Sequence, residues 1–187
     1  MILGLTGNIG SGKSLIANQL QLSGFHILDA DQLGHRVLQQ QQNTLVDRFG
    51  TSILDENGAI DRKKLGALVF ADSQKLTMLN QCVHPPMLQI IESEINEARQ
   101  QQQHFCVDAA LIFEWEIESW FDFVICVYSP PTFQQQNLQQ RGDIPQEQIQ
   151  KRIAAQQAVV NKIEKADFLI YNDSSKDKLF AQLEHIL

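Results

Sequence analysis

The sequence predicts an α/β fold built on a five-stranded parallel sheet flanked by helices. Five short apolar segments are rich in β-branched and aromatic residues, and longer segments of helical period separate them. The short segments are mostly apolar on both faces, which is typical of strands buried in a parallel sheet. Strands that alternate with helices indicate right-handed crossovers. The predicted strands are Ile2–Thr6, His26–Leu28, Phe105–Val107, Phe123–Val127 and Phe168–Ile170, and the clearest predicted helices are Lys13–Leu22, Gln32–Gln40 and Gln146–Lys165.

Two intervals do not fit a simple alternation of strand and helix. Residues 60–103 have helical patterns without a convincing strand, and residues 131–165 are polar, glutamine-rich and helical. Because ligands of open α/β sheets bind beyond the carboxyl ends of the strands, both intervals are natural substrate-covering elements. We therefore predict a core of residues 1–59, 104–131 and 166–187, a helical substrate-binding insert of residues 60–103, and a helical lid of residues 132–165.

Composition limits the class of protein. The chain has 187 residues, 43% of them hydrophobic and 20% charged, which fits about one folded domain. No apolar run approaches the roughly 20 residues of a membrane span, and the apolar N-terminus lacks the basic region of a signal peptide. The net charge of −7 argues against broad binding to nucleic acid or to an anionic membrane. We expect a cytoplasmic protein with neither nucleic-acid nor membrane partners.

The cysteines agree with a reducing compartment. Cys82, Cys106 and Cys126 are odd in number and have no metal-ligand spacing, and the last two lie inside apolar runs. We expect buried thiols rather than a disulfide or a zinc site.

A glycine-rich segment carries the strongest functional signal. Residues 7–14, GNIGSGKS, match G-x-x-x-x-G-K-[ST] between a predicted strand and a predicted helix. Glycines let backbone N–H groups surround phosphate oxygens, and the helix N-terminus adds partial positive charge. Lys13 can reach the β- and γ-phosphates, and the Ser14 hydroxyl can bind Mg²⁺. An accidental glycine-rich turn is the alternative, but the strand and helix around it favour a P-loop NTPase-type fold. The predicted nucleotide-binding residues are Gly7, Asn8, Ile9, Gly10, Ser11, Gly12, Lys13, Ser14 and Leu15.

Two carboxylates lie at the ends of predicted strands. Asp31 could orient an acceptor hydroxyl and take its proton, or it could simply cap the helix predicted to begin at Gln32. Asp108 follows an apolar strand as a Walker B aspartate does, and it could hold Mg²⁺ or serve as a turn residue. Local pattern alone leaves both choices open.

The sequence resembles the dephospho-CoA kinase family over essentially its whole length. The phosphate loop is common to many families, whereas the other matching blocks are more particular in their order and spacing. Those blocks are DADQLGHRV (29–37), DRKKLGALVF (61–70), LNQCVHP (79–85), DAALIFE (108–114), RGD (141–143), AAQ (154–156) and KADFLIYN (165–172).

The resemblance implies transfer of the γ-phosphoryl group of ATP, with Mg²⁺, to the ribose 3′-hydroxyl of dephospho-CoA, the final step of coenzyme A biosynthesis. It implies that Asp31 is the catalytic aspartate and that Lys13 and the loop bind ATP, with Asp108 and Ser14 at the metal. It also implies that Arg141 is a lid arginine that binds ATP and takes part in catalysis. The residues that it assigns to the substrate are Asp31, Arg62, Asn80, His84 and Lys162.

The sequence departs from the family pattern in two places. Ala110 stands where proline is usual, which loosens one turn. The start of the lid, FQQQN (133–137), has no arginine, so that Lys151, Arg152 or Lys162 could supply the missing cation. We expect a monomer or a weak homo-oligomer.

Two other functions compete with this interpretation. Another phosphate-loop kinase would act on a nucleoside, a nucleotide or a shikimate-like acceptor. A nucleotide-dependent switch would need a guanine-reading element, but residues 161–164 read NKIE inside a helical stretch, and residues 108–111 lack D-x-x-G.

Overall fold

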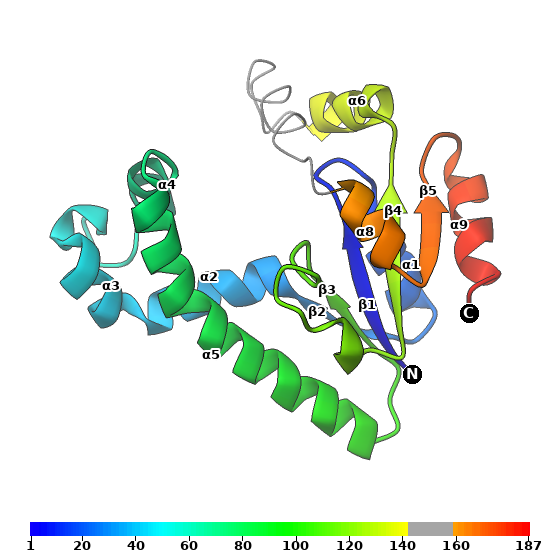
Figure 1. The fold of residues 1–187 in the computed structure, drawn as a ribbon, viewed down its shortest axis with the longest axis horizontal. Helices are drawn as coiled ribbons and strands as arrows, with labels where there is room; N and C mark the ends of the chain where they lie inside the picture. The colour runs from blue at the N-terminus through cyan, green and yellow to red at the C-terminus, as the bar shows by residue number, and fades with distance from the viewer. Residues whose placement is uncertain (142–158) are drawn as a thin grey trace. The chain divides into compact units, whose positions relative to one another are not determined.

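A computed structural model describes residues 1–141 and 159–187 and contains the predicted five-stranded parallel sheet. The strand order is β2-β3-β1-β4-β5, and each strand runs one residue beyond its predicted end (Figure 1). The strands are β1 (Ile2–Gly7), β2 (His26–Asp29), β3 (Phe105–Asp108), β4 (Phe123–Tyr128) and β5 (Phe168–Tyr171).

The central strand β1 is buried over its whole length, as expected for a parallel sheet covered on both faces. Leu3 and Leu5 belong to a core cluster with Ile16 of helix α1 (Lys13–Leu22). Gly4 points to the other face, where an added Cβ would lie 2.9 Å from the Phe121 ring. Apolar side chains therefore fill both faces around β1.

Helices cover the two faces of this sheet. Helix α9 (Lys176–Glu184) joins α1 in the same apolar cluster through Leu179 and Leu183. Helix α8 (Val159–Lys165) contacts β1 and β4 and lies in front of the sheet in Figure 1, whereas α1 lies behind it. A short 3₁₀ helix, η2 (Glu118–Trp120), precedes β4, and helix α6 (Pro131–Arg141) follows β4. All of these elements belong to one compact unit, residues 1–28 and 95–187.

Residues 29–94 form a second compact unit, which is helical. It contains α2 (Ala30–Gln40), α3 (Gln42–Phe49), the 3₁₀ helix η1 (Thr51–Ile53), α4 (Arg62–Phe70) and most of α5 (Ser73–Gln100). The interval predicted to lack strands, residues 60–103, thus holds α4 and α5. The division into a core, a substrate-binding insert and a lid assigns functions to segments and stays a prediction.

Aspartate caps begin two helices of this second unit. The Asp29 carboxylate accepts hydrogen bonds from the backbone N–H groups of Asp31 and Gln32, so α2 begins two residues before the predicted start. The Asp61 carboxylate accepts from the N–H groups of Lys63 and Lys64, and the Lys64 hydrogen bond lowers the pKa of Asp61.

The cysteines are free and buried, which confirms the prediction of buried thiols. Burial raises the pKa of Cys126 to about 11 and raises the pKa of Cys106 further. Within residues 1–141 and 159–187, no helix is long and apolar enough to cross a bilayer.

Candidate active site

The glycine-rich loop lies between β1 and α1, in the strand–loop–helix context that the sequence predicts. Gly12 caps the N-terminus of α1 with a φ of 95°, a left-handed conformation that favours glycine. An added Cβ on Gly7 would lie 2.4 Å from the Val127 carbonyl oxygen, so the loop also packs against β4. The Ser11 hydroxyl oxygen is buried and has no hydrogen-bond partner among the described residues. The loop can therefore present backbone donors and a helix N-terminus to an anion.

Lys13 and Asp108 form an ion pair beside this loop. The Lys13 ammonium donates a hydrogen bond to Asp108 Oδ1, and the two side chains are 17% and 9% exposed. Asp108 ends β3, where the sheet register places it opposite Leu5 of β1. The carboxyl ends of two neighbouring strands thus bring together the lysine and the aspartate that the sequence predicted separately. Because the pair is mostly buried, removal of either side chain would leave an unpaired buried charge and would destabilise the fold.

A second lysine enters the same end of the sheet from α8. The Lys162 side chain is 8% exposed, its ammonium donates to the Ala110 carbonyl oxygen, and it lies 3.0 Å from Glu114 Oε1. The Ala110 oxygen also lies 3.4 Å from Thr6 Oγ1 of β1. The contact between Lys162 and Glu114 was not visible in the sequence, because the two residues are far apart in the chain.

The residues predicted to bind Mg²⁺ have suitable chemistry. Ser14 offers an exposed hydroxyl at the start of α1, and Asp108 offers carboxylate oxygens at the end of β3. Mg²⁺ prefers oxygen ligands, commonly one or two from protein completed by phosphates and water. Over the described ranges no cluster of three His, Cys, Asp or Glu side chains could hold a metal ion. The donor set therefore fits a metal that arrives with the nucleotide.

Asp31 is the second residue of α2, and its side chain is exposed. The alternative that Asp31 caps this helix is wrong, because Asp29 makes the cap through bonds of 2.8 Å to the Asp31 nitrogen and 3.0 Å to the Gln32 nitrogen. Asp29 Oδ2 also accepts from the Gln32 side chain. The Asp31 carboxylate therefore does not cap α2.

Arg62, the first residue of α4, contacts His35 of α2 within the second unit. The Arg62 Nη1 atom lies 2.6 Å from His35 Nε2, and both side chains are exposed. Arginine can only donate, so the histidine nitrogen accepts. No pattern in the sequence points to this contact of His35, although His35 belongs to the same matching block as Asp31.

Asn80 and His84 lie four residues apart on α5 and therefore share a face of that helix. Both are half-buried, and burial lowers the pKa of His84. Pro85 and Pro86 follow within the same helix.

The lid predictions lie largely outside the described residues. Arg141 ends α6, but its side chain is not among those described, and Lys151 and Arg152 fall in residues 142–158. The identity of the lid cation stays a prediction.

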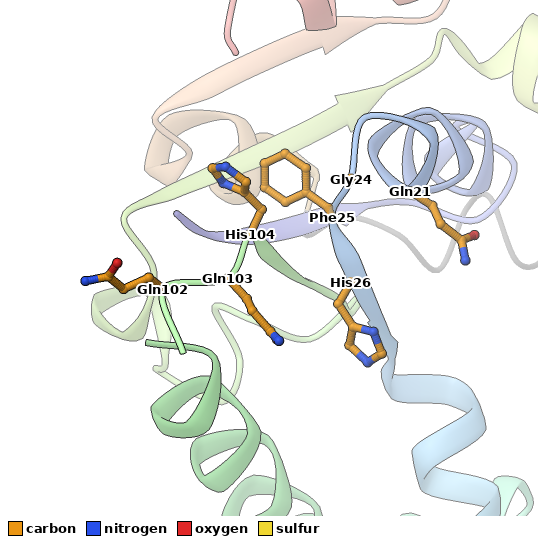
Figure 2. Close-up of a pocket in the computed structure, with 7 residues that line it drawn as sticks. All are labelled: Gln21, Gly24, Phe25, His26, Gln102, Gln103 and His104. Carbon is orange, nitrogen blue, oxygen red and sulfur yellow. The ribbon is translucent and has the colours of Figure 1, made fainter. Parts of the chain in front are cut away.

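A pocket of about 510 Å³ lies at the amino ends of β2 and β3, whereas the glycine-rich loop lies at the carboxyl ends of the strands. Figure 2 shows the rings of Phe25 and His104 side by side, with centroids 5.1 Å apart, while Gln21 and Gln102 point away from each other. None of the predicted site residues lines this pocket. It is separate from the candidate active site.

Comparisons with known proteins cover nearly the whole chain. The family model described as dephospho-CoA kinase matches residues 1–178. The dephospho-CoA kinase of Wolinella succinogenes is 33% identical over 186 residues, covering 99% of this chain and 92% of the relative. A crystal structure of a Thermus thermophilus protein is similar with a TM-score of 0.85 at 28% identity, covering 100% of this chain and 95% of that one. The dephospho-CoA kinase structure from Campylobacter jejuni gives a TM-score of 0.77 at 25% identity, covering 99% and 94%.

Proposed function

The chain belongs to the dephospho-CoA kinase family, and we propose a role for each of its site residues in that reaction. The enzyme phosphorylates dephospho-CoA with ATP in coenzyme A biosynthesis. The γ-phosphoryl group moves to the ribose 3′-hydroxyl: a bond forms between that oxygen and phosphorus, the bond to the β-phosphate oxygen breaks, and ADP leaves. Catalysis of this kind depends on positioning and on stabilisation of phosphate charge.

Residues around the glycine-rich loop bind the donor. The loop N–H groups and the N-terminus of α1 bind the phosphates, and Lys13 moves its hydrogen bonds from Asp108 to the β- and γ-phosphate oxygens. The Lys13–Asp108 pair is the observation that carries this proposal, because it keeps a desolvated ammonium beside the loop before ATP binds. Ser14 and Asp108 would hold Mg²⁺, which neutralises phosphate charge when bound. Lys162 supplies a further cation, held by Glu114 and the Ala110 carbonyl.

Residues of the second unit bind the acceptor. Asp31 orients the 3′-hydroxyl and takes its proton as the new bond forms. Its exposure and its freedom from helix capping support this role. Arg62, Asn80 and His84 bind dephospho-CoA, and the exposed guanidinium of Arg62 is a suitable partner for an acceptor phosphate. Arg141 closes on the donor phosphates.

An acceptor-dependent phosphorylation assay tests the reaction. Purified enzyme is incubated with ATP labelled at the γ-phosphate and with dephospho-CoA, its 3′-deoxy analogue, adenosine or shikimate. We expect label to transfer to dephospho-CoA alone, with one ADP formed for each coenzyme A detected by mass spectrometry. Efficient labelling of adenosine or shikimate would instead support another small-molecule kinase, which the family match does not favour.

Magnesium dependence is tested separately. Removal of divalent cations with a chelator should abolish transfer, and added Mg²⁺ should restore it, because the protein itself offers few metal ligands. Cytoplasmic residence, the absence of a nucleic-acid partner and a monomeric or weakly associated state stay predictions.

A further inference from the structure

The carbonyl groups of the glycine-rich loop have side-chain partners from distant parts of the chain. The Asn172 side-chain nitrogen donates to the Ser11 carbonyl oxygen at 2.8 Å, and the Asn137 side-chain nitrogen donates to the Gly10 carbonyl oxygen at 2.8 Å. Asn172 follows β5, and Asn137 lies on α6. Two segments distant in sequence therefore bind two consecutive carbonyl groups of the loop.

The Asn172 contact sets the direction of one N–H donor of the loop, and the Asn137 contact holds the peptide that closes the loop's turn. In a trans peptide the carbonyl oxygen and the following N–H point in opposite directions. A hydrogen bond that holds the Ser11 carbonyl on one side therefore directs the Gly12 N–H to the other. The Ser11 N–H, which belongs to the preceding peptide, closes a turn by donating to the Asn8 carbonyl oxygen at 3.1 Å. The loop is thus held with its conformation set before any phosphate binds.

Asn172 is itself held by a buried network. It is 7% exposed, its backbone N–H donates to the Tyr128 carbonyl oxygen at 2.8 Å, and its own carbonyl oxygen accepts from the Ser129 hydroxyl at 2.7 Å. The Ser129 carbonyl oxygen in turn accepts from the side chain of Gln134 at 2.9 Å. Ser129 and Gln134 are also buried, so the backbone from which the Asn172 side chain reaches the loop is strongly constrained.

Close packing between Asn172 and Gly12 points to the same role. An added Cβ on Gly12 would lie 2.3 Å from the Asn172 side-chain nitrogen. The loop therefore needs glycine at this position for the close approach of the amide as well as for its positive φ.

We propose that Asn172 and Asn137 are positioning residues that preorganise the glycine-rich loop for the phosphates of ATP. They act through the loop carbonyls and do not touch the nucleotide phosphates themselves. This inference rests on the proposed function of the loop as the ATP site. Replacing a residue that orients the phosphate donors should weaken the binding of ATP alone. Replacing a residue that only stabilises the fold should weaken the binding of both ATP and dephospho-CoA.

Asn172→Asp is the sharpest variant, since it keeps the shape and replaces the amide donor with an acceptor. Calorimetric titrations give the Kd values of ATP and dephospho-CoA separately. We expect the Kd of ATP to rise at least about tenfold, the scale of one lost buried hydrogen bond, while the Kd of dephospho-CoA stays within about twofold. The KM of ATP should rise by a similar factor.

A pH series adds a signature that a purely structural role would not produce. A carboxyl group that faces a carbonyl oxygen binds a proton more readily, and the protonated form can donate to that oxygen. The ATP affinity of Asn172→Asp should therefore recover toward the wild-type value between about pH 8 and pH 6. The wild-type protein should show no comparable recovery.

Asn137→Ala provides a second test at a partly exposed position, where folding is less at risk. We expect a rise of about threefold to fivefold in the Kd of ATP, since the lost bond is less buried. Asn18→Ala, an exposed asparagine on α1, is the matched control and should leave both Kd values unchanged.

Unchanged ATP affinity in folded Asn172→Asp and in Asn137→Ala, against a wild-type enzyme that binds ATP, would overturn the positioning role alone. Equal losses of affinity for ATP and dephospho-CoA would also overturn it. A wild-type protein that fails to bind ATP in the same titration would overturn the proposed function as well. If Asn172→Asp does not fold, the result for Asn137→Ala decides.

Discussion

The two units of this protein place their functional side chains in different ways. Around the glycine-rich loop, Lys13, Asp108 and Lys162 are largely buried, and each takes part in an ion pair. In residues 29–94, Asp31 and Arg62 are exposed and lie in the first turns of helices that neighbouring aspartates cap. Tertiary contacts thus organise the residues proposed to bind the donor, whereas local helix geometry organises Asp31 and Arg62, which are proposed to bind the acceptor.

This difference predicts two kinds of mutational effect. A change at a buried ion pair removes a charge proposed to bind the donor and also leaves an unpaired charge in the interior, so both activity and stability should fall. A change at an exposed residue in the first turn of a helix should alter activity with little cost in folding free energy.

Lys13→Ala should reduce turnover by about a thousandfold or more, since related phosphoryl transfers depend on a positioned cation to that extent. We also expect weaker ATP binding and a lower Tm, because Asp108 loses the lysine of its ion pair. Rate assays, ATP titration and thermal denaturation measure the three effects. Lys178→Ala, at an exposed lysine on α9, is the control. Normal ATP binding together with normal turnover in Lys13→Ala would exclude the proposed donor site.

Asp31→Asn should reduce turnover at least about a hundredfold, the scale of lost general-base catalysis. ATP affinity and Tm should stay near the wild-type values, because the carboxylate is exposed and does not cap α2. Asp29→Ala is the comparison variant and should lower stability by about 1 kcal/mol through loss of the cap. Unchanged turnover in Asp31→Asn would rule out its role as a base.

Arg62→Ala should raise the KM of dephospho-CoA about tenfold, the effect of losing one charge-assisted contact. The KM of ATP should not change, since Arg62 is proposed to bind the acceptor and not ATP. Steady-state kinetics with each substrate varied in turn measures this split. Lys63→Ala, at the next exposed residue of α4, should change neither KM value. A rise in the KM of ATP would show that Arg62 also contributes to ATP binding, and would contradict the proposed separation of donor-binding from acceptor-binding residues.

The smallest expected effect is the pH dependence at His84. Burial lowers its pKa below 6.5, so the unfolded chain binds the proton more tightly than the folded protein. The histidine therefore contributes stability above pH 6.5 that is lost as the pH falls through that value. Between pH 7.5 and pH 5.5, the Tm of His84→Gln should fall less than the Tm of the wild-type protein. An equal or larger loss in the variant would contradict this linkage.

The sequence predicted the core of the fold well because period and composition report burial directly. All five strands were confirmed, and α1 was predicted with its observed bounds. The start of α2 was placed too late, because Asp29 and Asp31 are both acceptable caps and only the hydrogen bonds distinguish them. The ion pair between Lys13 of α1 and Asp108 at the end of β3 was not predicted, although the sequence had assigned both residues to the nucleotide site.

By itself, the sequence determined the α/β class, the glycine-rich loop, the position of Asp108 at the end of β3, and the family. Each of these depends on residues close together in the chain or on an ordered set of motifs. Asp31, which was expected at the end of a strand, lies instead in the first turn of α2. Only the tertiary structure decided that Lys162 pairs with Glu114, that Arg62 contacts His35, and that Asn172 and Asn137 hold the loop carbonyls. Those partners come from distant segments. Their hydrogen bonds depend on distances of a few tenths of an ångström, which no local pattern encodes.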